Sequence, residues 1–138
     1  MDVLVEENPM SQPSLHAVEL LARMIGLDMV IVFSEPSQKF KSEHAPLLES
    51  HLLFQIELEN RGLLFAAGPM LEDDGLPDGH GMTILNVASI NEARKLWSEE
   101  PFHQAGLRTD TFQRWRLNEG GLNIKLGFST GSFKIKQT

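Results

Sequence analysis

The sequence contains no cysteine and no tyrosine among its 138 residues. The missing cysteines exclude disulfides, thiolate metal sites and cysteine nucleophiles. Aromatic residues are few, eight Phe and two Trp, yet with 41% of its residues hydrophobic the chain is too apolar to be disordered. A chain of this length fits one domain and buries roughly two-thirds of its unfolded surface, so we expect it to fold without covalent cross-links.

Long apolar runs are also missing. The stretch over residues 27–33 is too short to cross a membrane and is interrupted by Asp28. The N-terminus has neither the basic segment nor the apolar core of a signal peptide, so we expect a cytoplasmic protein with no membrane partner. Lys and Arg together number 12 against 19 acidic residues, and the resulting net charge of −7 argues against nucleic acid as a partner.

The charge is distributed unevenly along the chain. Residues 69–80 contain four acids and no base, whereas residues 108–138 contain six bases and two acids. Solvated loops and a basic edge strand would explain this pattern. Two alternatives stay open: the two segments attract each other, or the basic segment binds an anionic ligand.

The apolar spacing predicts an order of helices and strands. Helices are expected over residues 14–25, 46–60 and 90–99, the last opened by a capping box formed by Ser89 and Glu92. Strands are expected over residues 29–33, 63–67, 82–87 and 108–117, with a hairpin over 122–128 and 132–136. A loose tail is expected over residues 1–12, a polar loop over 34–43, and an acidic, glycine-rich loop over 68–81.

Residues 28–117 therefore follow the order β-α-β-β-α-β. This order predicts an α+β, ferredoxin-like sandwich with an antiparallel sheet, to which the chain adds an N-terminal helix and C-terminal strands. We expect three parts: a tail and helix over residues 1–27, the ferredoxin-like domain over 28–118, and an extension over 119–138. Because the helices of such a unit cover one sheet face, we expect a homodimer whose sheets pack face to face.

No motif for a metal or a cofactor is present, and we expect neither. His44 and His51 are seven residues apart, about two helical turns, which is too far for both to bind one metal ion. The glycines over residues 75–81 lie among acids and open no helix, so they do not suit a nucleotide phosphate.

His51 is the residue best placed for chemistry, because it lies on the apolar helix stripe of Leu47, Phe54 and Leu58. It is either a half-buried structural histidine or a general acid or base that titrates near neutral pH. The second role needs a carboxylate to orient the ring. Glu100 is a candidate because it precedes Pro101, which forces an extended backbone; alternatively, Glu99 and Glu100 form a solvated acidic pair.

Two sets of residues resemble the YCII-related family. The first half matches in His51-Leu52, Gly62 and the run Leu-Leu-Phe-Ala-Ala-Gly-Pro-Met over residues 63–70. The second half matches in Ser89, Glu92-Ala93, Trp97, Glu100-Pro101-Phe102 and Ala105-Gly106-Leu107. The resemblance covers about residues 28–118. It implies a dimeric α+β barrel, a fold shared with muconolactone isomerase and with small cofactor-independent monooxygenases.

The resemblance also implies a site. One characterised line of the family is similar to a dehydrochlorinase that acts on a hydroxylated aromatic, with an active dyad formed by a helix His and an Asp. His51 matches that histidine, and Glu100 stands where the family usually has Asp before proline. A residue near Asn60 is another position from which the ring could be oriented. We expect a substrate pocket between this helix and the sheet, lined by Phe33, Ser34, Gly68, Pro69, Met70 and Phe102.

Two functions are therefore open. The first is a cofactor-independent enzyme of the lyase or isomerase type, in which His51 moves a proton on a small anionic or aromatic molecule and Glu100 orients the histidine. The second is a non-catalytic dimeric module that binds a small molecule or a partner in the same cleft. In a third case His51 serves only stability. The fold alone does not decide among them.

Overall fold

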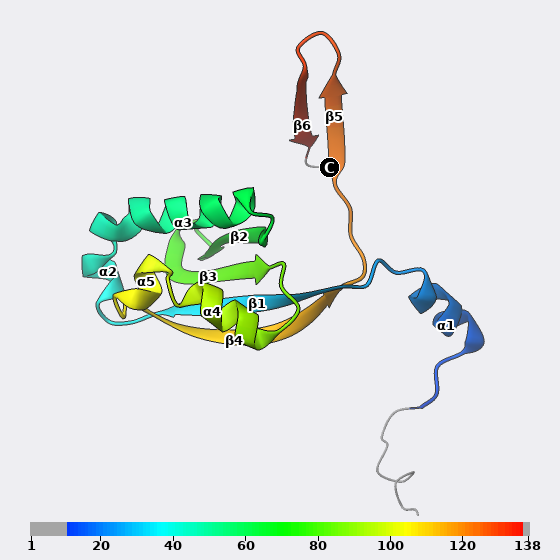
Figure 1. Ribbon diagram of the computed structural model, residues 1–138, viewed down its shortest axis with the longest axis horizontal. Coiled ribbons are helices and arrows are strands. Elements are labelled where there is room, and N and C mark those ends of the chain that lie inside the picture. The colour runs from blue at the N-terminus through cyan, green and yellow to red at the C-terminus, as the bar shows by residue number, and fades with distance from the viewer. Residues whose placement is uncertain (1–10, 137–138) are drawn as a thin grey trace, which may run out of the picture. The chain divides into compact units, whose positions relative to one another are not determined.

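A computed structural model describes residues 11–136 of the chain (Figure 1). One compact unit spans Leu27–Leu117. It contains β1 (Leu27–Pro36), α2 (Phe40–Glu43), the 3₁₀ turn η2 (Ala45–Leu47), α3 (Leu48–Asn60), β2 (Leu64–Leu71), β3 (Pro77–Leu85), α4 (Ile90–Trp97), α5 (Pro101–Gln104) and β4 (Arg108–Leu117). Helix α1 (Leu15–Ala22) precedes the unit, and β5 (Asn123–Gly127) and β6 (Ser132–Lys136) follow it. Most of the tail predicted over residues 1–12 falls outside the described residues.

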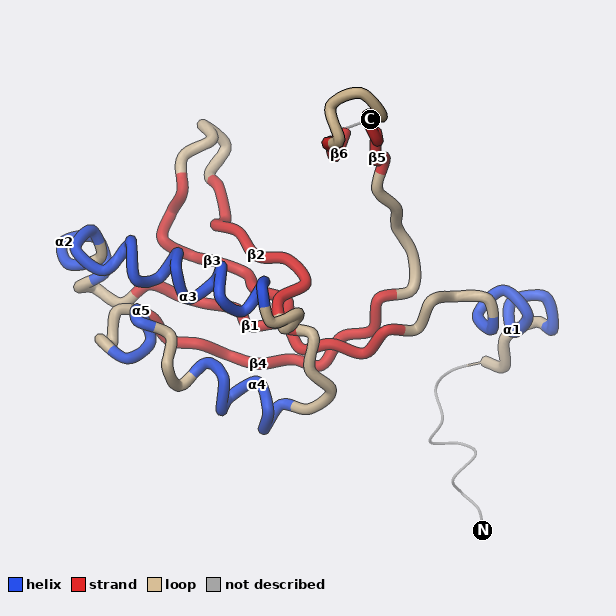
Figure 2. The backbone as a smooth tube through the Cα atoms, turned by 45° about the horizontal axis from the view of Figure 1, so that its top comes forward, coloured by secondary structure: helices blue, strands red, loops and turns tan. Residues whose placement is uncertain are grey.

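The four strands of the unit form one antiparallel sheet in the order β2-β3-β1-β4 (Figure 2). The two long strands β1 and β4 pair along their whole lengths, from Leu27 with Leu117 to Pro36 with Arg108. This strand order, with α3 and α4 as the connecting helices, is the ferredoxin-like arrangement. The predicted α+β class is confirmed.

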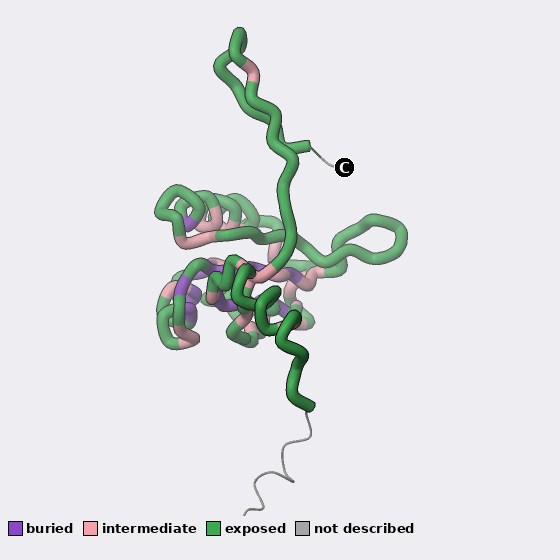
Figure 3. The backbone as a smooth tube through the Cα atoms, turned by 90° about the vertical axis from the view of Figure 1, so that its right-hand side faces the viewer, coloured by how far each residue is buried: buried purple, intermediate pink, exposed green. Residues whose placement is uncertain are grey.

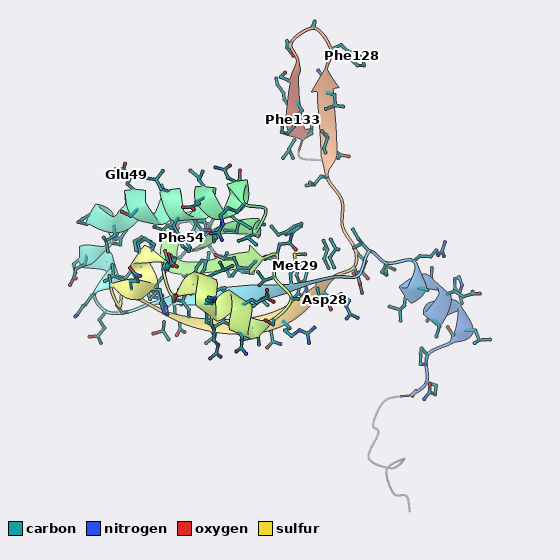
Figure 4. The ribbon with its side chains drawn as sticks, in the orientation of Figure 1. Asp28, Met29, Glu49, Phe54, Phe128 and Phe133 are labelled. Carbon is teal, nitrogen blue, oxygen red and sulfur yellow. The ribbon has the colours of Figure 1, made fainter. Side chains whose placement is uncertain are left out.

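The main core lies between the sheet and the two longer helices. Alternation along β1 points Val30 and Val32 toward Leu58 of α3 and toward Ala93 and Trp97 of α4, and all five side chains are buried. Phe54 points from α3 toward the sheet (Figure 4) and meets the Trp97 ring edge-on, at 5.7 Å between centroids. This core fixes α3 over the sheet.

The opposite face of the sheet has a second, smaller cluster. Met29, Ile31 and Ile84 are buried there, and three partly buried side chains pack over them: Met82, Trp115 and Leu117. Phe33 projects from the same face and is 41% exposed. The helices α3 and α4 pack on the other side, so within the unit Leu27–Leu117 no helix covers this face.

Strand pairing extends further than periodicity predicts. β1 runs on to Pro36, where a polar loop was expected from residue 34, because Ser34 pairs with both Gly81 and Asp110. β2 and β3 also lengthen, so the acidic loop expected over 68–81 is a short turn over residues 72–76. These extensions are stabilised by backbone hydrogen bonds. Backbone hydrogen bonding produces no pattern of apolar residues, so the sequence does not reveal the extensions. The four-residue helices α2 and α5 were missed for the same reason.

The elements outside the unit are mostly exposed (Figure 3). Ser14 caps α1 by accepting a hydrogen bond from the Ala17 N–H at 3.0 Å, as the pattern predicted. The register of the β5–β6 hairpin gives it two different faces. Its apolar face consists of Ile124, Leu126, Phe133 and Ile135, and its basic face includes Lys125, Lys134 and Lys136. None of the helices within residues 11–136 is long and apolar enough to cross a membrane.

The core predicts a sharp contrast between two leucines of α3. Replacing Leu58, which is 2% exposed, with Ala should lower the free energy of unfolding by about 2–5 kcal/mol, because it removes buried apolar area and leaves a cavity. Replacing Leu53, which is 58% exposed on the same helix, should cost about 0.5 kcal/mol or less. Urea titrations of both variants measure this, and equal losses would contradict the described packing of α3.

Candidate active site

A cleft of about 1260 Å³ opens between α3 and the strands β2 and β3. Its walls are mainly apolar, with Leu48, Leu52 and Ile56 from α3 and residues 64–69 from β2. Most of these wall residues are exposed, so the cleft is open to solvent. Polar side chains also line it, among them His51, Gln55 and Arg108. An apolar cleft with a few converging polar groups is the usual form of a small-molecule site.

His51 of α3 is hydrogen-bonded through Nδ1 to the Oε1 atom of Glu100. The two residues are 49 positions apart, so α3 and the segment before α5 must both be in place for this contact. Only 13% of the histidine side chain and 1% of the Glu100 side chain are exposed. A carboxylate can only accept hydrogen bonds, so Nδ1 is the donor and Nε2 carries the lone pair of the neutral ring.

The Glu100 carboxylate has a second partner. Its Oε2 atom accepts a hydrogen bond from the backbone N–H of His103 at 2.8 Å, which makes Glu100 the N-cap of α5. Its backbone is extended, with φ −70° and ψ 127°, as expected for a residue before proline. The helix predicted over residues 90–99 would place Glu100 just beyond its C-terminal end. The structure places it instead at a helix N-terminus, where the backbone dipoles stabilise negative charge.

Phe102 forms the floor under the histidine. The His51 and Phe102 rings are stacked, with centroids 4.3 Å apart and an interplanar angle of 16°. Phe102 is 2% exposed and cannot move without disturbing the core. The imidazole is therefore fixed by a hydrogen bond at one nitrogen and by a buried ring on one face.

A second histidine–carboxylate pair lies on the other side of α5. His103 Nδ1 is 2.7 Å from Asp110 Oδ2, and the Ser34 hydroxyl donates to Asp110 Oδ1 at 2.5 Å. The Asp110 side chain is fully buried, whereas 40% of the His103 side chain is exposed. This pair ties α5 to β4 and β1, and through the His103 N–H it also holds the carboxylate of Glu100.

Arg108, at the start of β4, is the cation of the site. Its guanidinium carbon lies 4.9 Å from the ring centre of Phe40 and 5.1 Å from that of Phe102. Its Nε and Nη2 atoms donate to the carbonyl oxygen of Gly79 at 3.2 and 3.0 Å. Burial lowers the pKa of Arg108 from its ordinary value, and the nearby carboxylates of Glu100 and Asp110 act against that shift. Arginine nevertheless remains charged at neutral pH.

The structure brings some of the expected site residues together and separates others. His51, Gly68, Pro69 and Phe102 line the cleft, and Glu100 contacts His51 directly. Phe33, Ser34 and Met70 do not line it; they line a smaller depression beside Thr109 and Thr111. Alternation along β1 turns Phe33 to the face without helices, and the Ser34 hydroxyl is taken by Asp110. Asn60 lies nine residues beyond His51 on α3, about 13 Å along the axis, so Glu100 is the partner of His51.

Other residues of the site were missed by sequence reasoning. Arg108 was assigned only to a basic strand segment, although the alternation of β4 places it on the same face as Phe112, which packs against the main core. Phe40 fell in the loop predicted over 34–43, and His44 lies just before the helix predicted from residue 46; their ring centroids are 4.7 Å apart, and both rings belong to the cleft wall. Within residues 11–136, no three His, Asp or Glu side chains come close enough together to hold a metal ion.

Comparison with known proteins agrees with this architecture. Among solved structures, the chain is similar to the 5-chloro-2-hydroxyhydroquinone dehydrochlorinase of Burkholderia phenoliruptrix AC1100 in complex with 2,5-dihydroxybenzoquinone. The TM-score is 0.52 and the sequence identity 18%, over 63% of this chain and 92% of that chain, which shows a shared fold. A search of curated proteins finds no match.

The model of the YCII-related domain matches residues 29–114, more than half of the chain and nearly all of the sheet-and-helix unit that holds the cleft. The match includes both His51 and Glu100. The chain belongs to the YCII-related family.

Proposed function

We propose that this protein is a cofactor-independent enzyme of the lyase or isomerase type that moves a proton on a small molecule. The observation that carries the proposal is the contact of His51 Nδ1 with the buried carboxylate of Glu100, at the wall of an apolar cleft. A general base needs a ring nitrogen free to reach the substrate and a second group that fixes the ring. Nε2 of His51 is the free nitrogen, and Glu100 is the fixing group.

The chemistry follows from the tautomer. With its hydrogen on Nδ1, His51 can accept a proton at Nε2, and the resulting imidazolium is stabilised by the adjacent carboxylate. Returning the proton to another atom of the same molecule gives an isomerisation; loss of a leaving group after proton removal gives an elimination. The fold neighbour is a dehydrochlorinase in complex with a dihydroxybenzoquinone, which supports a small aromatic or anionic substrate.

A second candidate is a non-catalytic module that binds a small molecule in the same cleft. The observation that favours it is the exposure of the cleft, because most of its apolar wall residues from α3 and β2 are open to solvent. In that case the His51–Glu100 pair would add to affinity or stability without turnover. The two candidates differ in whether the bound molecule is consumed.

The exposed sheet face supports a homodimer. Phe33, Trp115 and Met82 lie on the face that α3 and α4 leave uncovered, together with polar Thr109 and Thr111. An apolar centre with polar residues beside it is typical of subunit interfaces. We propose that two copies pack these faces together.

Replacing His51 with Gln should abolish turnover while leaving the melting temperature within about 5 °C of the wild type, because the amide can still donate to Glu100. Activity can be sought without a known substrate by incubating wild type with a pool of small metabolites and following depleted compounds by mass spectrometry. The matched control is His16→Gln, on exposed α1. If H51Q still depletes the same compound, His51 is not the catalytic base. Binding without depletion by wild type supports the binding module, and a large stability loss supports a structural role.

Replacing Glu100 with Gln should lower kcat by roughly 10²–10⁴, because an amide can donate to Nδ1 and so favour the wrong tautomer of His51. Glu99→Gln is the control, since Glu99 is the exposed neighbour of the same charge and length. Steady-state kinetics on the compound found by depletion measure the effect. Equal rates for E100Q and E99Q would show that the buried carboxylate does not orient the base.

In solution the protein should have twice the chain mass of 15.5 kDa. Phe33→Glu should shift it toward the monomer, because it places a charge on the uncovered sheet face. Leu53→Glu, an exposed leucine on the outer side of α3, should leave the mass unchanged. Light scattering after size exclusion at micromolar concentration reports both. A monomeric wild type removes the dimer proposal.

A further inference from the structure

The guanidinium of Arg108 has hydrogen-bonding capacity that the protein does not use. Arginine has five N–H groups. The described contacts use Nε and Nη2, both on the carbonyl of Gly79. Within residues 11–136, no carboxylate oxygen lies within 4.0 Å of the guanidinium, although Glu100 and Asp110 both act on its charge from further away. The remaining donors include Nη1, and Arg108 is part of the cleft lining.

The surroundings of Arg108 hold this cation in a fixed position. The rings of Phe40 and Phe102 lie against the guanidinium, and Phe102 is buried. Gly79 brings its carbonyl to Arg108 with a positive φ of 95°, in a space where a Cβ would come within 3.1 Å of Pro36. A half-buried cation has lost part of its hydration, and Arg108 has no carboxylate in contact to compensate for that loss. An anion that binds there therefore gains a strong charge-assisted hydrogen bond.

The cation and the base both lie against the same buried ring, Phe102. The His51 ring is 4.3 Å from the Phe102 centroid, and the Arg108 guanidinium carbon is 5.1 Å from it. The two groups are therefore at most about 9.4 Å apart, the sum of these two distances, and both line the cleft, so one small planar molecule can contact both. Gln55 adds a further polar group: it lies one turn beyond His51 on α3, lines the cleft, and its Oε1 atom is buried without a hydrogen-bond partner.

The cleft also contains acidic residues, among them Glu59, Glu72 and Asp78. These three residues are exposed, so water and salt screen their charges. Arg108 is half-buried, where screening is weaker and a contact at hydrogen-bond distance counts most. Arg108 can therefore meet an anion at hydrogen-bond distance, although the buried carboxylates of Glu100 and Asp110 reduce the positive potential around it.

We propose that Arg108 binds an anionic oxygen of the substrate, a carboxylate or an ionised enol or phenol attached to a planar apolar body, beside the proton that His51 removes. This inference rests on the proposed function and specifies its substrate class. Bidentate contact with the free N–H groups would orient the molecule. The same contact would stabilise negative charge that develops on that oxygen as His51 takes the proton.

The test uses benzoate and benzamide, two probes of the same shape that differ in charge. Amide chemical shifts of Gly79, Gly81 and Thr83 follow the titrations in the full-length protein. Wild type should bind benzoate at least about 10-fold more tightly than benzamide, because a charge-assisted hydrogen bond is stronger than a neutral one. Arg108→Gln should bring the ratio close to one, and Arg108→Lys should give an intermediate ratio, since lysine keeps the charge without the planar fork.

Arg94→Gln is the matched control, because Arg94 also lies over an aromatic ring, Phe112, but is not part of the cleft lining. It should keep the wild-type ratio. His51→Gln should also keep the wild-type ratio of benzoate to benzamide affinity. Loss of turnover in H51Q supports the proposed catalytic role of His51, and loss of the anion preference in R108Q alone supports the proposed role of Arg108. If R108Q does not fold, two other measurements test the assignment. These are the affinity ratio of Arg108→Lys and the shift of the Arg108 side-chain N–H signals when wild type is titrated with benzoate. Benzoate preference that survives in R108Q, or no saturable benzoate binding to wild type, overturns the assignment whatever H51Q does.

Discussion

The buried carboxylate of Glu100 is the constraint on which the site depends. With 1% of its side chain exposed, it has lost nearly all of its hydration, and two donors compensate it: the imidazole of His51 and the backbone N–H of His103. One donor comes from α3 in the first half of the ferredoxin-like unit and the other from α5 in the second half. Removing a partner from such a group is costly, because it leaves a buried charge unpaired. The carboxylate therefore couples the orientation of the histidine to the packing of both halves.

The length of the glutamate side chain fits this double role. An Asp is the better N-cap in general, since its shorter side chain reaches the amide two or three positions ahead with little loss of freedom. Here the carboxylate must cap α5 and also reach a ring on another helix. The additional methylene lets one oxygen stay on the His103 N–H while the other meets His51 Nδ1. The Glu that stands where the resemblance implies an Asp is thus long enough to make both contacts.

Local signals predicted most of the fold because they are carried by single residues or short patterns. The Ser89 cap of the Glu92 N–H and the stripe that ends in Leu58 are such signals, and both are present in the structure. The Glu92 carboxylate accepts from the Ser89 hydroxyl, so the second half of the predicted capping box takes another form. The extension of β1 to Pro36 was not predictable, since it depends on pairing with Arg108, more than seventy residues away. Within the site, His51 and Glu100 were recognised from their positions on a helix and before a proline. Phe33 and Met70 were assigned to the cleft because they are adjacent in sequence to cleft residues. Adjacent residues of a strand point to opposite faces of the sheet, which this reasoning did not take into account.

Arg108 was missed for a related physical reason. Its significance comes from three groups that lie far apart in the sequence, the rings of Phe40 and Phe102 and the carbonyl of Gly79. The net charge of −7 gave no indication of a cation in the cleft, because it is a sum over mostly solvated groups. At ordinary ionic strength such charges act over about 8–10 Å, whereas a half-buried guanidinium acts at contact. The electrostatics of a ligand site therefore depend on its desolvated charges, which here are the guanidinium and the buried carboxylates of Glu100 and Asp110. In this chain the guanidinium and the imidazole of His51 both lie against one buried aromatic ring, Phe102.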